Sequence, residues 1–328
     1  MLILNEQNYQ YLLLGSLFFG CGGGLDYKAH KKIFDNIFKY KSSLIIKDIS
    51  EFKNEDWLAS VYGVGDPSKV KVNFRSLILK ALKTYEEKTK IKIKGIIPGE
   101  IGAEGLAFQA ASYLNLPVVD SDLVGGRAAP EIQMDCFSVF NVPLTPLLGY
   151  AVNDKALFLL GKFSAKEIEN LLRDFFAKNK GVGILIGYPI QKIKFEKICI
   201  KNTLSYAIEV GKILYKKDLK SLVKFVKPFK VIEEQVKNIY LKSEDGFYQG
   251  FIYLKNHKIF VKNENIYIER GNKRIFTAPD LIVIVNENLF PIHNTEVKNY
   301  LNKKVFILLI KARGYWKLRK AKNLWKVI

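Results

Sequence analysis

The sequence contains little cysteine and little histidine, and these shortages exclude two classes of protein. The three cysteines, Cys21, Cys136 and Cys199, are an odd number without close spacing, so we expect a reducing compartment and no disulfide framework. The three histidines are far apart along the chain, and none stands at a spacing typical of zinc ligands. We therefore expect neither a disulfide-stabilised secreted domain nor a zinc-binding module.

Long hydrophobic runs are also absent. No apolar stretch approaches the roughly 20 residues that a membrane-spanning helix needs. The first residues, Met1 to Glu6, lack the charged region and the cleavage site of a signal peptide. We expect a cytoplasmic protein that makes no contact with a membrane.

Arginine is scarce although the chain is strongly basic, with a formal net charge of +20. Only seven arginines occur, and lysines supply the other positive charges. Proteins that read nucleic acids depend on arginine for bidentate contacts, so we interpret the lysines as a solvated surface and expect no nucleic-acid partner. The alternative rests on the lysine-rich stretch 311–326, which contains Trp316 and Trp325.

The apolar residues that are present, 48% of the chain, are enough for a sizeable core. A length of 328 residues fits two domains, which we place at 1–160 and 161–328. The clearest unit is a strand at 92–97, a helix at 103–114 and a strand at 116–119. Such a β-α-β unit predicts parallel strands joined by a right-handed crossover.

The second half changes character near residue 228, where a mixture of helices and strands gives way to short alternating runs. Asn, Gly and Asp turns separate these runs, as in an all-β fold. The sequence thus predicts an α/β N-terminal domain with a parallel β-α-β core. It also predicts a C-terminal α+β domain that ends in an all-β module resembling a barrel or a sandwich. The predicted strands of this module are 247–254, 258–262, 265–269, 274–276, 281–285 and 304–310.

Polar residues before periodic apolar segments predict where helices begin. Pro130 predicts a further short helix that contains Glu131, Gln133 and Met134. The predicted N-caps are Asn5, Asp26, Asn73, Ser164, and either Asn202 or Thr203.

Three carboxylates follow the two strands of the β-α-β unit. Glu100 comes after the first strand, and Asp120 and Asp122 come after the second. The carboxyl ends of parallel strands are the edge at which open α/β sheets bind ligands. These carboxylates are candidates for a general base, for metal ligands or for acceptors of ligand N–H groups. The alternative is that they only cap loops and helices.

A glycine-rich loop precedes the helix that Asp26 is expected to cap. The amides of Gly22, Gly23 and Gly24, together with a helix N-terminus, predict a site for an anion or a carbonyl group. A tight turn between two helices is the alternative. Cys21, beside the loop, is either a nucleophile with a stabilised thiolate or a small residue that fills space.

Arg127 follows two glycines and is itself followed by Glu131 and Gln133. Its guanidinium could clamp a carboxylate in a bidentate manner. The alternative is a surface ion pair, which contributes well under ~1 kcal/mol. We expect His293 to lie at the surface without a partner.

Several of these segments together resemble the S-methyl-thiohydantoin desulfurase-like family, long known as a domain family of unknown function. Its members often accompany hydantoinase- or oxoprolinase-type enzymes. The resemblance covers nearly the whole chain and is most specific from Gly126 to Met134. The sequence departs from the family's pattern at Cys21, where the family commonly has threonine. The segments that carry it are Phe19–Gly24, Pro98–Gly102, Val119–Asp122, Gly126–Met134, Thr203–Ser205, Asn263–Asn265 and Pro279–Ile282.

The resemblance implies a substrate among the cyclic ureides and thioureides, such as hydantoins and thiohydantoins. It implies a hydrolase or desulfurase that attacks a C–S or C–N bond, with an activated water or an unidentified divalent metal. In this hypothesis the glycine amides hold developing negative charge and Arg127 orients a substrate carboxylate. The implied catalytic residues are Glu100, Asp120 and Asp122, and the implied substrate-binding residues are Gly22, Gly23, Gly24, Arg127, Glu131 and Gln133.

The alternative function is not catalytic. The chain would then be a binding or assembly subunit for a hydantoinase- or oxoprolinase-type partner, with the β module as its interface. In either case we expect a small-molecule ligand and a homo-oligomer.

Overall fold

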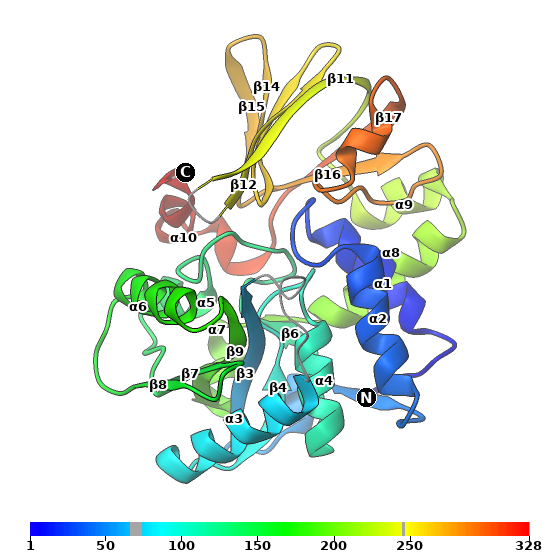
Figure 1. Cartoon of the computed structure of the whole chain (residues 1–328). Coiled ribbons are helices and arrows are strands. Elements are labelled where there is room, and N and C mark those ends of the chain that lie inside the picture. The colour runs from blue at the N-terminus through cyan, green and yellow to red at the C-terminus, as the bar shows by residue number, and fades with distance from the viewer. Residues whose placement is uncertain (66–73, 245–246, 328) are drawn as a thin grey trace.

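The computed structural model describes residues 1–65, 74–244 and 247–327 (Figure 1). The predicted N-cap Asn73 lies outside these residues. Within them, no helix is both long enough and apolar enough to cross a membrane.

Eight strands form the first sheet within the described residues. Four neighbouring strands, β2, β5, β4 and β3, run parallel to one another. Ile96 pairs with Val118 in parallel, which confirms the predicted β-α-β core. In spatial order the strands are β1 (Leu2–Leu4), β2 (Leu44–Lys47), β5 (Val118–Val119), β4 (Ile93–Ile97), β3 (Trp57–Gly65), β9 (Val182–Gln191), β7 (Leu147–Ala151) and β8 (Ala156–Leu159).

The strand β9 is a long apolar segment because both of its faces are buried. Residues 182–188 are buried at every position, as expected for a strand covered on both faces. Figure 1 shows the helices α3 (Phe74–Thr89) and α6 (Ala165–Lys178) on either side of β3 and β9. The chain after residue 160 therefore contributes β9 to the sheet that holds the β-α-β unit.

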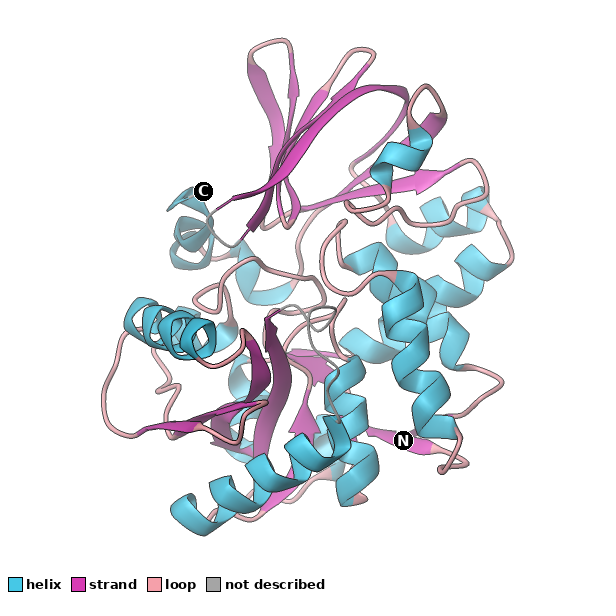
Figure 2. Ribbon diagram, in the orientation of Figure 1, coloured by secondary structure: helices cyan, strands magenta, loops and turns pink. Residues whose placement is uncertain are grey.

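Seven antiparallel strands form the second large sheet of the described residues. Figure 2 shows that this sheet curls upon itself. Asn265 Nδ2 of β14 donates to Ile282 O of β16 (2.9 Å), which joins two strands that are not neighbours in the sheet and helps to hold the curl. The module is thus one half-barrel, not two packed sheets. In spatial order its strands are β15 (Lys273–Thr277), β14 (Glu264–Arg270), β13 (Lys258–Lys262), β12 (Phe247–Leu254), β11 (Lys230–Glu244), β17 (Lys304–Ile310) and β16 (Leu281–Asn286).

Two short strands, β6 (Ser121–Asp122) and β10 (Ile200–Lys201), pair separately. The remaining α-helices are α1 (Tyr9–Phe19), α2 (Tyr27–Phe38), α4 (Gly105–Leu114), α5 (Cys136–Phe140), α7 (Lys192–Ile198), α8 (Thr203–Tyr215), α9 (Leu219–Val226) and α10 (Arg319–Leu324). The 3-10 helices of the described part of the chain are Ile49–Glu51, Val297–Tyr300, Gly314–Lys317 and Trp325–Val327.

Two of the predicted helix caps are confirmed. The Asp26 carboxylate accepts hydrogen bonds from the backbone N–H groups of Lys28 and Ala29, both 2.9 Å. Ser164 forms a reciprocal capping box with Glu167 at the start of α6. Both caps join residues that are close in sequence, which is why a local pattern finds them.

The prediction that Asn5 caps the first helix is wrong. Its carboxamide accepts from Gln7 N and Asn8 N (3.1 Å each) within a turn, and α1 begins only at Tyr9.

The short helix predicted from Pro130 is also wrong. Met134 N donates to Glu131 O (3.1 Å), which closes a turn. The helix α5 begins later, because Asp135 accepts from Ser138 N (2.7 Å) and supplies a stronger N-cap.

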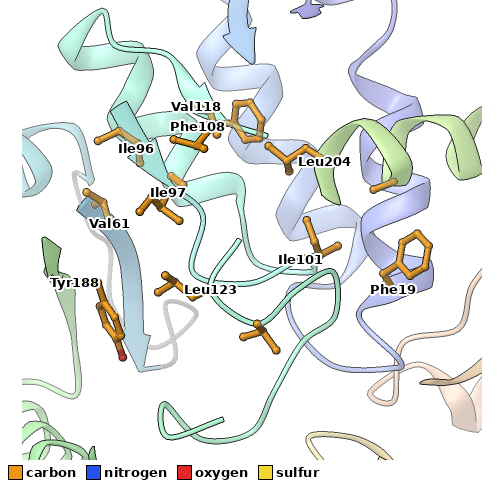
Figure 3. Close-up of a cluster of buried hydrophobic side chains, with 14 of the residues drawn as sticks. Phe19, Val61, Ile96, Ile97, Ile101, Phe108, Val118, Leu123, Tyr188 and Leu204 are labelled. Carbon is orange, nitrogen blue, oxygen red and sulfur yellow. The ribbon is translucent and has the colours of Figure 1, made fainter. Parts of the chain in front are cut away.

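A continuous core joins the first sheet to the helices α1 and α8. Figure 3 shows Ile97 of β4 and Phe108 of α4 in this core, with Ile101 between the sheet and Phe19. The two helices touch closely at Gly15, where a Cβ atom would come within 1.8 Å of the Ala207 carbonyl oxygen. The core therefore fixes the loop after β4 against the end of α1.

Candidate functional site

Asp120 caps a helix from a distant part of the chain. Its Oδ1 accepts from the N–H groups of Leu204 (2.9 Å) and Ser205 (3.0 Å), the first turn of α8. The prediction that Asn202 or Thr203 caps this helix is confirmed for the position of Asn202 only, because the capping hydrogen bonds go to Asp120. Asn202 occupies the N-cap position with φ +62°, and its side chain makes no capping hydrogen bond.

Asp122 holds the loop that follows it. Its carboxylate accepts from Val124 N (3.1 Å), Gly125 N (2.9 Å) and Gly126 N (2.7 Å). Burial raises the pKa of Asp122 to about 7, against the effect of these donors. Three backbone donors take up its oxygens, so the structure gives Asp122 a role in shaping the loop.

Glu100 is different, because fewer donors reach it. Its Oε2 accepts from Ala129 N (2.8 Å), and its side chain keeps partial exposure. Burial, followed by the charges of Asp122 and Glu104, raises the pKa of Glu100 to about 8. A carboxyl with such a pKa holds its proton for most of the time at neutral pH and can still release it.

The glycine loop packs against the second sheet and its following loop. Gly22 O accepts from Asn294 N (2.8 Å). A Cβ atom on Gly23 would lie 2.2 Å from Glu264 Oε1. The loop is therefore more than a turn between helices, since its missing side chains allow a carboxylate of β14 to approach the backbone.

His293 contacts the same loop, and the prediction of a surface position is wrong. It is 7% exposed, and its Nε2 lies 3.3 Å from the Gly24 carbonyl oxygen. Its Nδ1 lies 2.7 Å from Thr295 Oγ1. Burial lowers the pKa of His293, so a neutral ring donates to Gly24 and accepts from Thr295.

Cys21 is fully buried and has φ +51°. Burial raises the pKa of its thiol to about 11, which disfavours the thiolate that a nucleophile needs. The alternative of a small space-filling residue agrees with this environment. Its carbonyl oxygen accepts from Asn265 N (2.8 Å), which adds a further bond between the loop and β14.

Arg127 is 1% exposed, so the prediction of a surface ion pair is wrong. Its Nη1 donates to the carbonyl oxygens of Pro279 (2.5 Å) and Asp280 (3.2 Å), and its Nε donates to Ala128 O (2.9 Å). The guanidinium lies 4.2 Å from the centre of the Trp325 ring. Stacking and carbonyl acceptors replace water around this cation.

The Nη2 of Arg127 has no hydrogen-bond partner among the described residues. Burial lowers the pKa of Arg127, and the charges of Glu264 and Glu100 act in the opposite sense. A buried N–H group without an acceptor is rare. The Nη2 group therefore keeps donor capacity that the described residues do not use.

Glu264 is the residue that our sequence reasoning missed. It is 2% exposed, and its Oε2 has no partner within the described part of the chain. Burial, followed by the charge of Glu100, raises its pKa well above the ordinary value, and Arg127 lowers it. The segment Asn263–Asn265 was part of the family resemblance, but no local signal assigned Glu264 a role. The name glycine-loop site is used below for Gly22, Gly23, Gly24, Glu100, Arg127 and Glu264.

Glu131 and Gln133 belong to a neighbouring contact between the two sheets. Glu131 Oε1 pairs with Lys262 Nζ (2.7 Å), and its Oε2 accepts from Gln133 Nε2. Lys262 also lies 4.2 Å from the centre of the Phe247 ring. The polar groups of Glu131 and Gln133 are thus engaged within the protein.

A surface pocket borders Arg127. Lys311 and Arg313 also line it, and no carboxylate is among its described lining residues. Arg313 stacks over Tyr206 at 4.4 Å, and Lys311 pairs with Asp280 at 2.8 Å. Three cations therefore line this pocket, one of them paired with a carboxylate outside the lining, and this excess of positive charge favours an anionic group.

The described residues hold no group of three or more His, Cys, Asp and Glu side chains arranged to bind a metal ion. A divalent metal stays a prediction.

Comparison with known proteins assigns the family. Residues 7–159 match the model of the S-Me-THD-like N-terminal domain, and residues 164–325 match that of the C-terminal domain. The chain belongs to the S-Me-THD-like family. This confirms the resemblance drawn from the sequence, and the convergence of its segments around the glycine loop gives that resemblance a physical basis.

A solved structure shares the fold of this S-Me-THD-like chain. It is the crystal structure of a protein from Chromobacterium violaceum, a target of the Northeast Structural Genomics Consortium, with a TM-score of 0.79 and 20% identity. The match covers 100% of this chain and 97% of the other. No curated protein matches the sequence.

Proposed function

We propose that this S-Me-THD-like protein hydrolyses a five-membered cyclic thioureide or ureide in the glycine-loop site. The observation that carries the proposal is one pair of carboxyl groups, Glu100 and Glu264, whose pKa values are both raised. They share a buried guanidinium, Arg127, that keeps an unpartnered N–H group. Strongly shifted carboxyl pairs are typical of acid–base catalysis.

The environments of the two carboxyl groups support different roles for them. Glu264 is nearly fully buried, and its pKa is raised well above the ordinary value, so it serves as the general acid. Glu100 keeps partial exposure and has a pKa of about 8, so its carboxylate serves as the general base. A base with a pKa near the working pH is efficient.

The reaction consumes one water molecule. The Glu100 carboxylate takes a proton from the water molecule while the water oxygen bonds to the ring carbon. The C–S or C–N bond then breaks, and Glu264 donates its proton to the leaving sulfur or nitrogen. Arg127 Nη2 donates a hydrogen bond to the heteroatom that gains negative charge in the tetrahedral intermediate. An S-methyl substituent would leave as methanethiol, and a cleaved hydantoin ring would give a ureido acid. Exchange with solvent then removes the proton from Glu100 and returns one to Glu264.

The surface pocket supports binding of a substrate that carries a carboxylate. Lys311, Arg313 and Arg127 line this pocket, so an anionic substituent there would place the ring near Arg127. In this proposal Asp120 and Asp122 are structural, because each already accepts at least two backbone N–H groups.

The test is an assay of hydantoins and S-methyl-thiohydantoins, with and without a carboxyalkyl substituent. Thiol release and ring opening would be measured for the wild type, Glu100→Gln and Glu264→Gln. We expect each variant to lose at least about 100-fold in kcat, the scale of general acid–base catalysis. The control is Glu209→Gln, which removes an exposed ion pair with Lys212.

Unchanged turnover in both glutamine variants would contradict these roles. If the wild type binds a panel member in calorimetry but turns over none, the non-catalytic binding function takes precedence.

A further inference from the structure

A second buried polar cluster lies behind the glycine-loop site. It consists of Ser16 of α1, His30 of α2 and Glu104 just before α4, and none is more than 2% exposed. Glu104 Oε1 accepts a hydrogen bond from the Ser16 hydroxyl. His30 Nε2 lies 3.5 Å from the same oxygen.

Serine, histidine and a carboxylate are also the residue types of a hydrolase triad, but here their spatial arrangement is different. In a triad the histidine lies between the nucleophile and the carboxylate. Here the carboxylate of Glu104 lies between Ser16 and His30. Burial lowers the pKa of His30, which keeps the ring neutral. The cluster therefore cannot activate Ser16 in the manner of a triad.

What the cluster does hold is the backbone at Gly102. Gly102 N donates to Glu104 Oε2 (2.9 Å) and lies 3.2 Å from Ser16 Oγ. Gly102 O accepts from Leu25 N (2.8 Å), directly after the glycine loop. A Cβ atom on Gly24 would come within 2.4 Å of that carbonyl oxygen. Gly102 is thus clamped from both sides.

We propose that Glu104 is a positioning residue of the glycine-loop site. Glu104 holds Gly102 against the glycine loop. Glu100 lies two residues before Gly102, so its backbone is fixed in the same way. The effect of Glu104 on turnover rests on the proposed function. Its effect on the backbone at Gly102 does not.

Electrostatics support the same assignment. The charged groups that act on Glu100 are Asp122 and Glu104, which raise its pKa, and Arg127, which lowers it. Glu264 interacts with Glu100 from the second sheet. Glu104 therefore acts on Glu100 through its charge as well as through Gly102.

Two variants separate the charge from the hydrogen bonds. In Glu104→Gln the amide oxygen can still accept from Gly102 N, and the amide N–H can donate to the neutral ring of His30. In Glu104→Ala both contacts are lost. Ser16→Ala is the milder substitute if Glu104→Ala does not fold, and Glu209→Gln is again the control.

Three readouts apply to the full chain: titration of Glu100 by NMR with labelled glutamate, hydrogen exchange at Gly102 and Leu25, and the separate values of kcat and KM. In Glu104→Gln we expect Glu100 to titrate at lower pH, with little change in exchange. In Glu104→Ala, or in Ser16→Ala, we expect at least about tenfold faster exchange at both amides. For Glu104→Ala we expect about a tenfold lower kcat with KM within about twofold, as for a displaced catalytic group.

An unchanged Glu100 titration in Glu104→Gln, together with unchanged exchange in the folded alanine variant, would overturn the inference. A wild type without turnover would count against the proposed function alone, because titration and exchange need no substrate.

Discussion

Two regions of the molecule use buried carboxylates in opposite ways. After β5, Asp120 and Asp122 between them accept five backbone hydrogen bonds from α8 and from the loop 124–126. Around the glycine loop, Glu100 accepts one such bond, and Glu264 Oε2 accepts none within the described residues. Burial alone does not mark a functional carboxylate. In the proposed function, the carboxylates that act are those that are buried without sufficient donors, because their oxygens stay available to a ligand or to water.

The sharpest contrast is expected in stability. Asp122→Ala leaves two buried N–H groups and one half-buried N–H group without this acceptor and should lower the free energy of unfolding by about 3 kcal/mol or more. Glu264→Gln should be neutral or stabilising, since it removes a carboxyl that lacks full compensation. Urea unfolding of both variants measures the difference. Equal destabilisation would remove the distinction between the two regions.

The pH dependence gives a second test. The pKa of Glu100 in the folded state, about 8, lies above the unfolded value of about 4.3, so folding tightens proton binding. Its stabilising contribution is full below about pH 4.3 and is lost as pH rises toward about 8. Turnover should rise as the pH rises toward about 8, because Glu100 must be ionised to act as the base.

Thermal unfolding from about pH 5 to about pH 9 would test the stability part. Asp122 and Asp135 also titrate near pH 7, so the contribution of Glu100 is the difference between the wild type and Glu100→Gln. Parallel stability profiles for these two proteins would contradict the assignment.

The smallest effect is expected at Asp120. Asp120→Ala removes a helix cap and should cost about 1 kcal/mol, with kcat within about twofold of the wild type. If kcat falls as far as in Glu100→Gln while the variant stays folded, Asp120 has a catalytic role and not only a structural one.

Local patterns predicted much of the fold. The β-α-β unit follows from apolar runs of strand and helix length around Gly99 and Gly102, and the caps at Asp26 and Ser164 act within three residues. The strand β11 escaped prediction, because charged residues such as Glu233 and Lys237 interrupt its apolar alternation.

The site was less predictable, because its decisive contacts join segments far apart in the chain. Glu264 reaches Gly23, His293 reaches Gly24, and Asp120 caps α8. No spacing rule in one sequence indicates such pairs. The family resemblance grouped the right segments, but only the coordinates show which polar atoms remain without partners.

The tail suggested as a nucleic-acid surface has its aromatic rings turned inward. Trp316 Nε1 donates to Val124 O (2.6 Å), and Trp325 is 4% exposed against Arg127. Buried rings are not free to stack on bases.

The contact between Trp325 and Arg127 also sets an order of events during biosynthesis. Arg127 leaves the ribosome well before the segment that contains Trp325, so its guanidinium first meets the cell without the ring that covers it. Every proposed catalytic carboxylate is translated earlier than Trp325 as well. A nascent chain can therefore contain all of the proposed site residues and still leave Arg127 uncovered. The ring of Trp325 can cover Arg127 only after the segment that follows β17 has been translated.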